Sequence, residues 1–137
     1  MEILVIDTNI WCYYFCSQYK EHDKVARFLD KVLEKKRIAI NTIIAMEVAH
    51  FLVKSLGSER GSELFNAFLS FPMLVFDFTV DDLQLASQML ARYSRVGIGG
   101  RDATILAMMK SKNIKAIATH DKAFKKVKWI KVVDPLD

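Results

Sequence analysis

Short, largely apolar segments alternate along the chain with longer segments whose apolar residues recur at helical spacing. Strands are predicted at residues 2–6, 37–41, the MLVFDF stretch after Pro72, 114–119 and 129–133. Helices are predicted between them, at about 8–17, 21–36, 42–55, 58–71, 80–95, 101–112 and 121–127. Strands that are apolar throughout are typical of a parallel sheet covered on both faces. The pattern predicts a three-layer α/β sandwich in which residues 1–137 form one domain, because separate cores become common only beyond ~250 residues.

Capping residues help to place the predicted helix ends. Thr42 is expected to cap the helix that follows the second strand, and Gly57 is expected to end it. Thr79 and Asp82 have the spacing of a capping box and predict a helix start near residue 80.

Composition favours a soluble globular protein. Hydrophobic residues make up 52% of the chain and charged residues 26%, which argues against disorder. No apolar run reaches the ~18 residues of a membrane span, and the first strand lacks a signal-peptide pattern. Cys12 and Cys16 are too few for a zinc site and are expected to be buried free thiols. A reducing, cytoplasmic location is therefore expected, with no membrane contact.

Positive charge is concentrated near the C-terminus. Residues 110–131 hold eight lysines and one acid, a local charge of +7, so that the rest of the chain carries −3 within the net +4. This asymmetry fits a polyanionic partner such as nucleic acid. A solvated lysine-rich surface would explain the same pattern.

Two acids directly follow predicted strands. Asp7 comes after the first strand, and Asp121 comes after the fourth. In parallel sheets functional groups gather beyond the carboxyl ends of the strands, so both are candidate site residues. Each also precedes a predicted helix, where an Asp is a common N-cap.

Two further acids lie in helices. Between residues 43 and 53, nine of eleven residues are apolar and only Glu47 and His50 are not. An ionised carboxylate in so apolar a helix needs a cation, a hydrogen-bonding partner or a solvent-facing stripe. Asp102 begins a helix after the flexible segment 97–100, where the helix dipole favours an acid and the glycines allow close approach to a strand end.

A cluster of these four acids would require a cation. Two carboxylates ~4 Å apart repel by ~4 kcal/mol at an effective dielectric of 20, and a divalent cation reverses the sign of that energy. Ligands that are all oxygen favour Mg²⁺ or Mn²⁺. The chemistry that follows is phosphodiester hydrolysis by a metal-activated water. An acidic pocket beside a lysine-rich rim is the arrangement expected for a metal-dependent nuclease.

Several motifs together resemble the PIN domain. They are Val5-Ile6-Asp7-Thr8-Asn9, Glu47 in the helix after the second strand, Gly97 to Ile105 with Asp102, and the segment 119–124 (THDKAF). The resemblance spans nearly the whole chain, and the size is most similar to the VapC-type toxins of prokaryotic toxin–antitoxin systems.

The resemblance implies a metal-dependent ribonuclease. It places the catalytic and metal-binding roles on Asp7, Glu47, Asp102 and Asp121, with Asn9 and Thr119 supporting the pocket. It also implies a five-stranded parallel sheet in the order 3-2-1-4-5, a homodimer, an RNA substrate and a small antitoxin partner. Candidate RNA-binding residues are Arg101, Lys122 and Lys125, although Arg101 could equally be solvated.

Other residues depart from the pattern or allow a second interpretation. His120 stands where the family more often has Asn or Arg, so it is given no catalytic role. The aromatic run Trp11, Tyr13, Tyr14 and Phe15 is expected in the core or a dimer interface, although it could stack on RNA bases. Two alternative functions stay open. One is a catalytically inactive PIN-like module that binds RNA or protein. The other is an aspartyl-nucleophile phosphatase using Asp7, which Asn9 disfavours because a second acid is usual at that position.

Overall fold

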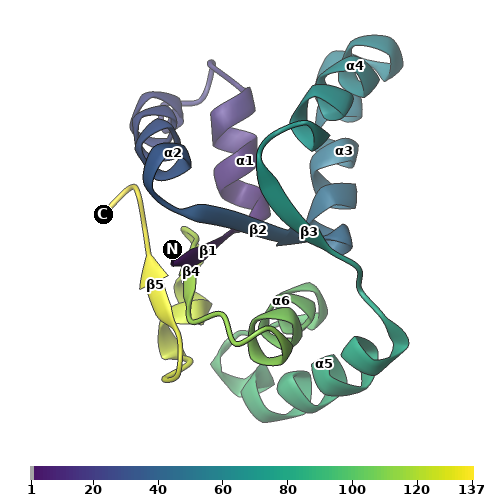
Figure 1. Ribbon diagram of the computed structural model, residues 1–137, viewed down its shortest axis with the longest axis vertical. Helices are drawn as coiled ribbons and strands as arrows, with labels where there is room; N and C mark the ends of the chain where they lie inside the picture. Colours follow the sequence, from purple (N-terminus) through teal and green to yellow (C-terminus); the bar gives the residue numbers. More distant parts are fainter. Residues whose placement is uncertain (1) are drawn as a thin grey trace.

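A five-stranded parallel sheet forms the middle of the molecule. The computed structural model describes residues 2–137. The strands are β1 (Ile3–Ile6), β2 (Arg37–Asn41), β3 (Met73–Phe76), β4 (Ala116–Ala118) and β5 (Lys131–Val133). Their spatial order is β3-β2-β1-β4-β5, with every neighbouring pair parallel (Figure 1). The predicted fold class and strand order are confirmed.

Helices cover both faces of this sheet. On one side lie α1 (Thr8–Phe15), α2 (His22–Lys35), α3 (Thr42–Leu56) and α4 (Ser58–Leu69). On the other side lie α5 (Val80–Tyr93), which continues into the short 3-10 helix η1 (Ser94–Val96), and α6 (Gly100–Ser111). A second 3-10 helix, η2 (Lys122–Lys126), connects β4 to β5. The structure therefore has the three layers predicted from the sequence.

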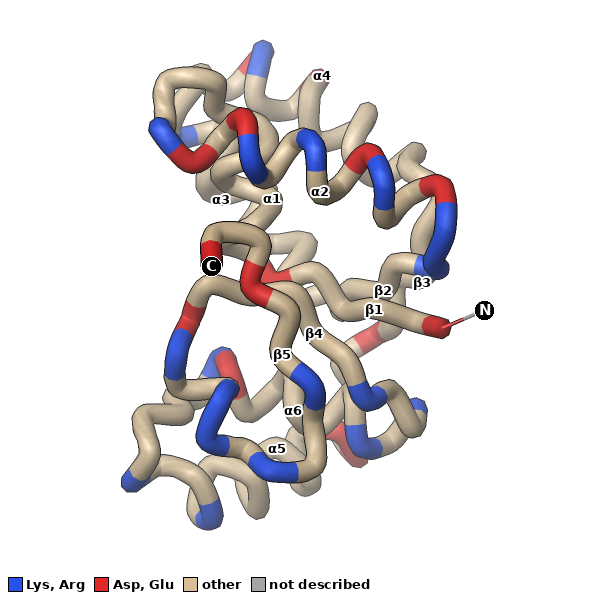
Figure 2. Tube along the Cα trace, turned by 90° about the vertical axis from the view of Figure 1, so that its left-hand side faces the viewer, with Lys and Arg blue, Asp and Glu red and all other residues tan. Residues whose placement is uncertain are grey.

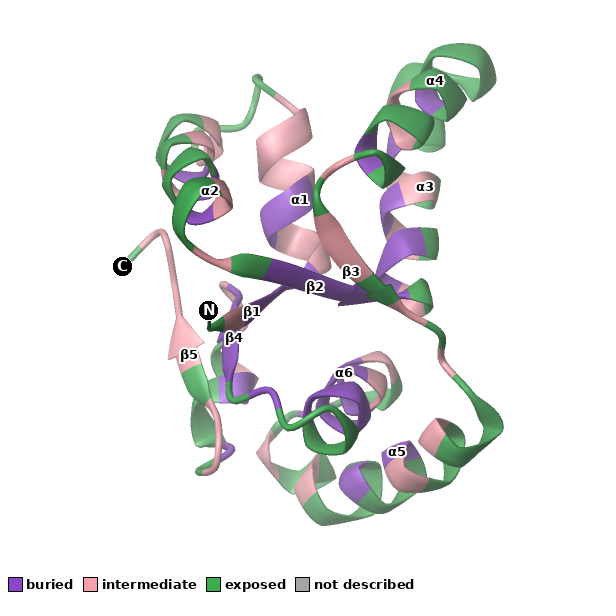
Figure 3. Cartoon of the chain, viewed as in Figure 1, coloured by how far each residue is buried: buried purple, intermediate pink, exposed green. Residues whose placement is uncertain are grey.

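The core lies between the sheet and its helices. The central strand β1 is deeply buried, with Leu4, Val5 and Ile6 at most 1% exposed (Figure 3). Trp11 is fully buried against Phe68 at 4.8 Å between ring centroids. Its indole Nε1–H donates to the Ile6 carbonyl at 3.1 Å, which fixes α1 against β1. Trp11 thus belongs to the core, one of the two locations expected for the aromatic run.

Helix ends follow the predicted signals with one correction. Asn41, not Thr42, caps α3, because the Asn41 side chain accepts from the Ile44 N–H at 2.8 Å. Thr42 is the first helical residue, and its hydroxyl accepts from the Phe78 N–H. Gly57 ends α3 with φ +86°, a left-handed conformation that favours glycine. The predicted capping box of Thr79 and Asp82 is confirmed at the start of α5.

Two further expectations bear on the environment of the chain. Over residues 2–137, every helix is too short or too polar to cross a bilayer. Cys12 and Cys16 are free thiols, as predicted, but they are half-buried and not fully buried. Cys12 lies in α1 and borders the cavity described below, whereas Cys16 directly follows the helix.

Candidate active site

Four segments meet at the carboxyl edge of the sheet. Asp7 follows β1, Asn41 ends β2, Thr119 and Asp121 follow β4, and α6 begins there with Arg101 and Asp102. In residues 2–137, the buried polar or charged side chains are all in this region: Asp7, Asn41, Asp102 and Thr119. Each of them has a hydrogen-bond partner. The polar residues that the fold buries are thus concentrated at one edge of the sheet. All of them are paired, as expected because an unpaired buried polar group would cost stability.

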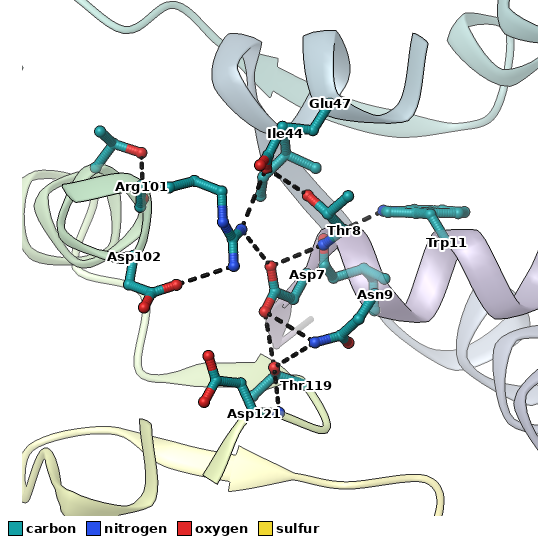
Figure 4. Close-up of polar contacts among 12 residues, drawn as sticks. Asp7, Thr8, Asn9, Trp11, Ile44, Glu47, Arg101, Asp102, Thr119 and Asp121 are labelled. Carbon is teal, nitrogen blue, oxygen red and sulfur yellow. Dashed lines mark hydrogen bonds and ion pairs between the residues drawn. The ribbon is translucent and has the colours of Figure 1, made fainter. Parts of the chain in front are cut away.

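Asp7 is the centre of the site (Figure 4). Its side chain is fully buried, and both of its carboxylate oxygens are hydrogen-bonded. Oδ1 accepts from the Thr8 N–H at 2.7 Å and from Arg101 Nη1 at 2.9 Å. Oδ2 accepts from the Thr119 hydroxyl at 2.7 Å and from Asn9 Nδ2 at 3.5 Å. The Thr8 contact is also the predicted N-cap bond of α1, so Asp7 caps this helix while it lies at the centre of the carboxylate cluster.

Thr119 and Asn9 hold the loop after β4 against the start of α1. The Thr119 hydroxyl accepts from Asn9 Nδ2 at 3.3 Å and from the Asp121 N–H at 3.0 Å while it donates to Asp7. Asn9 Oδ1 also accepts from the His120 N–H at 3.4 Å. These two residues therefore position Asp7 and the backbone of Asp121.

Arg101 lies among three of the predicted acids. Its Nη1 contacts Asp7 Oδ1 at 2.9 Å and Glu47 Oε1 at 3.2 Å, and its Nη2 contacts Asp102 Oδ1 at 2.9 Å (Figure 4). Glu47 Oε1 also accepts from the Thr8 hydroxyl at 2.8 Å. The guanidinium thus satisfies the requirement for a cation that the sequence predicted for this cluster. Sequence reasoning placed Arg101 at the substrate or in solvent and missed this central position.

Asp102 and Asp121 also shape local backbone structure. Asp102 Oδ2 accepts from the Gly99 N–H at 3.1 Å and closes the start of α6. Asp121 Oδ1 accepts from the Ala123 N–H at 3.0 Å and caps η2. Within the described chain Asp121 forms no ion pair, unlike the other three acids. Its negative charge is close enough to contribute to the electrostatics of Asp102.

The pKa values follow from burial and these charges. Burial raises the pKa of Asp102 above its usual range; the Gly99 N–H and Arg101 oppose that change, whereas Asp121 and Asp7 reinforce it. Burial disfavours the charged form of Arg101 and acts to lower its pKa. The negative charge of Asp7 and its hydrogen bond, together with the charges of Glu47 and Asp102, outweigh this effect, so the pKa of Arg101 is raised. Burial, together with Glu47 and Asp7, raises the pKa of the Cys12 thiol to about 12. Cys12 is therefore a neutral thiol at neutral pH.

The donor set is suited to a hard divalent cation, but Arg101 holds the carboxylates in another arrangement. Within residues 2–137, no three carboxylate, imidazole or thiol groups converge on one point where they could hold a metal ion. The oxygens of Asp7, Glu47 and Asp102 instead surround one guanidinium. Carboxylate oxygens are the ligands that Mg²⁺ and Mn²⁺ prefer, and one positive group already bridges three of them. The chemistry of the donor set thus suits such an ion, whereas the arrangement that the structure shows is an arginine bridged to three carboxylates.

A cavity opens beside the site. It has a volume of ≈ 380 Å³, and its lining includes the charged residues Arg101 and Glu47. The other lining residues are Thr8, Asn9, Cys12, Tyr13, Tyr19 and Phe51. Charged and aromatic groups therefore face the same space. That combination suits a ligand with both phosphates and bases.

The lysine-rich segment does not form a single rim around the site, contrary to the expectation from charge. Lys115 directly precedes β4 and Lys131 begins β5, so both lie at the amino edge of the parallel sheet. Lys110 and Lys112 lie at the far end of α6 from Asp102. Figure 2 shows basic residues spread over the half of the molecule around β5 and α6. The segment turns back across the sheet, which distributes its charge over both edges.

The remaining candidates follow β4. Lys122 is exposed at the start of η2, next to Asp121. The Lys125 ammonium contacts Asp137 at 2.7 Å and lies 3.9 Å from Asp134. His120 Nδ1 lies 2.9 Å from the nearly buried Asp134, a contact between residues 14 apart that the sequence pattern did not reveal.

The fold and the site define a class: a small parallel α/β domain with an acidic centre at the carboxyl edge of its sheet. The family model for the PIN domain matches residues 4–130. The chain therefore belongs to the PIN domain family.

Solved structures show the same fold at low sequence identity. VapC20 of Mycobacterium tuberculosis, a sarcin-ricin loop cleaving toxin, aligns with a TM-score of 0.77 and 20% identity over 93% of this chain and 96% of that chain. VapBC2 of Rickettsia felis, solved with a promoter DNA fragment, aligns with a TM-score of 0.74 and 23% identity over 96% and 98%. FitAcB of Neisseria gonorrhoeae aligns with a TM-score of 0.72 and 20% identity over 97% and 98%. A comparison with curated protein sequences gives no match.

Proposed function

We propose that the protein is a ribonuclease that hydrolyses phosphodiester bonds in RNA with the help of a divalent cation, Mg²⁺ or Mn²⁺. One observation carries the proposal: four carboxylates from separate segments gather at the carboxyl edge of the sheet, and three of them share a single positive group. Membership of the PIN domain family and the likeness to a sarcin-ricin loop cleaving toxin support the choice of RNA.

Each acid supplies a ligand oxygen from a different segment of the chain in this proposal. Asp7, fixed by Thr119 and Asn9, supplies a rigid ligand oxygen at the centre. Glu47 and Asp102 supply ligand oxygens from α3 and α6, and Asp121 supplies one from the turn after β4. When bound, a divalent cation lowers the pKa of a coordinated water and offsets the charge that develops on the phosphate. Asp7 is held by more groups than any of the other three acids, because its oxygens accept hydrogen bonds from Thr8, Arg101, Thr119 and Asn9.

The cavity beside the carboxylates receives the RNA in this proposal. Tyr13 and Tyr19 offer aromatic faces for unpaired bases, and Lys122 offers an exposed ammonium beside Asp121. Single-stranded RNA is the substrate class that suits these contacts, because bases can stack on aromatic rings only when they are unpaired.

We infer also that the protein is the toxin of a cytoplasmic toxin–antitoxin pair, forms a homodimer and binds a small antitoxin. The support is the likeness to proteins solved as toxin–antitoxin complexes, among them one from Klebsiella pneumoniae. Exposed apolar residues on α3 and α5 offer surfaces for such contacts: Met46 and Val53 on α3, and Val80 and Leu83 on α5.

Cleavage of labelled single-stranded RNA tests the activity. Purified protein with Mg²⁺ or Mn²⁺ is expected to cut the RNA, and EDTA is expected to stop the reaction. Asp7→Asn keeps the size of the side chain and removes its charge, and it should lower kcat/KM at least about a hundredfold. Asp30→Asn, the same change at an exposed position of α2, serves as the matched control and should leave cleavage unchanged.

The alternatives give different results in the same assay. RNA binding without cleavage at any metal concentration would favour an inactive PIN-like module. Hydrolysis of a small phosphate monoester through an acyl-phosphate on Asp7 would favour a phosphatase. Cleavage that survives Asp7→Asn would place the activity outside this site.

A further inference from the structure

We propose that Arg101 is a built-in competitor of the divalent cation: its guanidinium must leave Asp7, Glu47 and Asp102 before the cation can bind them. This inference rests on the proposed function and concerns how the same site is regulated. The observation that carries it is the position of one positive side chain within 3.2 Å of oxygens from three of the four acids.

The two cations cannot share these oxygens. Asp7 Oδ1, Glu47 Oε1 and Asp102 Oδ1 all point at the guanidinium, at 2.9, 3.2 and 2.9 Å. Mg²⁺ needs carboxylate oxygens at about 2.0–2.1 Å, and oxygens drawn in to that distance leave no room for the two Nη groups between them. The positive charges would also repel each other strongly at such a distance. Binding is therefore an exchange of one cation for another.

Loss of a proton cannot release the Arg101 guanidinium from the three acids. A guanidinium keeps its proton across the physiological pH range, and the surrounding acids raise its pKa further. Lysine at the same position would be a single, compact charge and could not reach oxygens on both sides with a planar fork. The side chain must move for the site to load.

The cavity beside the site gives the Arg101 side chain room to move. Its backbone is fixed in the first turn of α6, but its side chain is 30% exposed and forms part of the cavity wall. Rotation about side-chain torsions alone can turn the guanidinium towards the cavity. A phosphate group there would hold it through paired hydrogen bonds. Substrate phosphate and metal would then favour each other's binding, since the phosphate stabilises the released arginine.

Mn²⁺ affinity, measured by electron paramagnetic resonance on the full chain without RNA, tests the exchange. Removing the internal cation in Arg101→Gln should tighten Mn²⁺ binding at least about tenfold. Arg101→Lys keeps the charge and should give an intermediate affinity. Arg95→Gln removes the same charge from an exposed residue of η1 and should leave the affinity unchanged. Circular dichroism checks that each variant is folded, and the lysine variant preserves the test if the glutamine variant is not.

The outcomes separate the two proposals. Equal or weaker Mn²⁺ binding by Arg101→Gln, with clear binding by the unaltered protein, would overturn the competition and leave the proposed metal site intact. Absence of Mn²⁺ binding in every variant would overturn both. A second readout is the side-chain Nε–H resonance of Arg101, identified by its loss in Arg101→Lys. This resonance should shift as Mg²⁺ is added. If it is unchanged at a Mg²⁺ concentration at which the cleavage rate no longer rises, Arg101 stays in place and the proposal is wrong.

Discussion

The Thr119 hydroxyl connects Asp7, Asn9 and Asp121, and Thr119→Val tests how far the acidic centre depends on it. The substitution keeps the shape of a fully buried side chain and removes only its hydroxyl. That hydroxyl donates to Asp7 Oδ2 at 2.7 Å and accepts from the Asp121 N–H at 3.0 Å and Asn9 Nδ2 at 3.3 Å. Valine leaves a buried carboxylate oxygen with only the long Asn9 contact at 3.5 Å.

The size of the effect follows from these contacts. A hydrogen bond to a charged group contributes about 1.5–3 kcal/mol, and a neutral one contributes about 0.5–1.5 kcal/mol. Water can replace part of the contacts of Asn9 and Asp121, which are half-buried, but it cannot reach Asp7 Oδ2 as easily. We expect the free energy of unfolding to fall by about 3 kcal/mol, which for a domain of this size lowers Tm by about 10 °C.

Urea titration followed by circular dichroism measures this loss. Thr104→Val is the matched control, because its hydroxyl donates only to the neutral Arg101 carbonyl one turn earlier in α6, at 2.7 Å. The control should lose no more than about 1 kcal/mol. A loss for Thr119→Val as small as that of Thr104→Val would refute the argument that Thr119 stabilises the Asp7 carboxylate.

Three further predictions concern packing and titration. Gly61→Ala places a Cβ 2.6 Å from Val53 Cα where α4 packs on α3. A urea titration should therefore show that the free energy of unfolding falls by about 2 kcal/mol. The Cβ of Gly100→Ala meets no atom within 4 Å, so this control should not destabilise the protein. Equal losses of unfolding free energy in the two variants would contradict the argument. Trp11→Phe leaves the buried Ile6 carbonyl without the indole N–H at 3.1 Å and should cost about 2 kcal/mol in the same titration; a loss under about 0.5 kcal/mol would contradict it. Cys12, with a pKa of about 12 against an ordinary 9.0, should be alkylated at pH 8 about a thousandfold more slowly than an exposed thiol, as mass spectrometry can follow. The stability that its neutral form contributes should be lost as pH rises from about 9 towards 12, and rapid alkylation at pH 8 would contradict the raised pKa.

Most of the fold could be predicted from the sequence because its signals are local. Runs such as residues 2–6 and 37–41 are apolar on both faces, and only a covered parallel sheet buries both. Strand order is different, since periodicity does not say which strands are neighbours, and it came from the family resemblance. The cap of α3 was misplaced by one residue because Asn41 and Thr42 are both good caps. Only the backbone decides between them, and it remains extended at Asn41.

The acidic site was predictable in part for a similar reason. Asp7 and Asp121 follow strands, and Glu47 interrupts an apolar helix, so each has a local sequence signal. Arg101 has none, because its ion pairs reach 94 residues back to Asp7 and 54 residues back to Glu47. Of the two neighbours, only Asp102 can be recognised as a candidate from the sequence, because it lies at a predicted helix start. A surplus of four acids that need a cation, with an arginine beside one of them, is the signal that could have identified it.

The lysine-rich segment shows the limit of charge counting. Eight lysines within residues 110–131 give the net charge of that segment but not the direction in which each side chain lies. The segment passes from the end of α6 through β4 and η2 to β5, so it visits both edges of the sheet. Lys122 follows β4 beside the acids, whereas Lys115 and Lys131 lie at the amino edge.

The most direct test of the central claim is the anomalous diffraction of a crystal grown with Mn²⁺. We expect an anomalous peak at the carboxyl edge of the sheet, bound by Asp7 and by at least one of Glu47, Asp102 and Asp121. The guanidinium of Arg101 should then have left these carboxylates. A crystal that contains Mn²⁺ in its solvent, shows no peak there and retains all three Arg101 ion pairs would contradict the account.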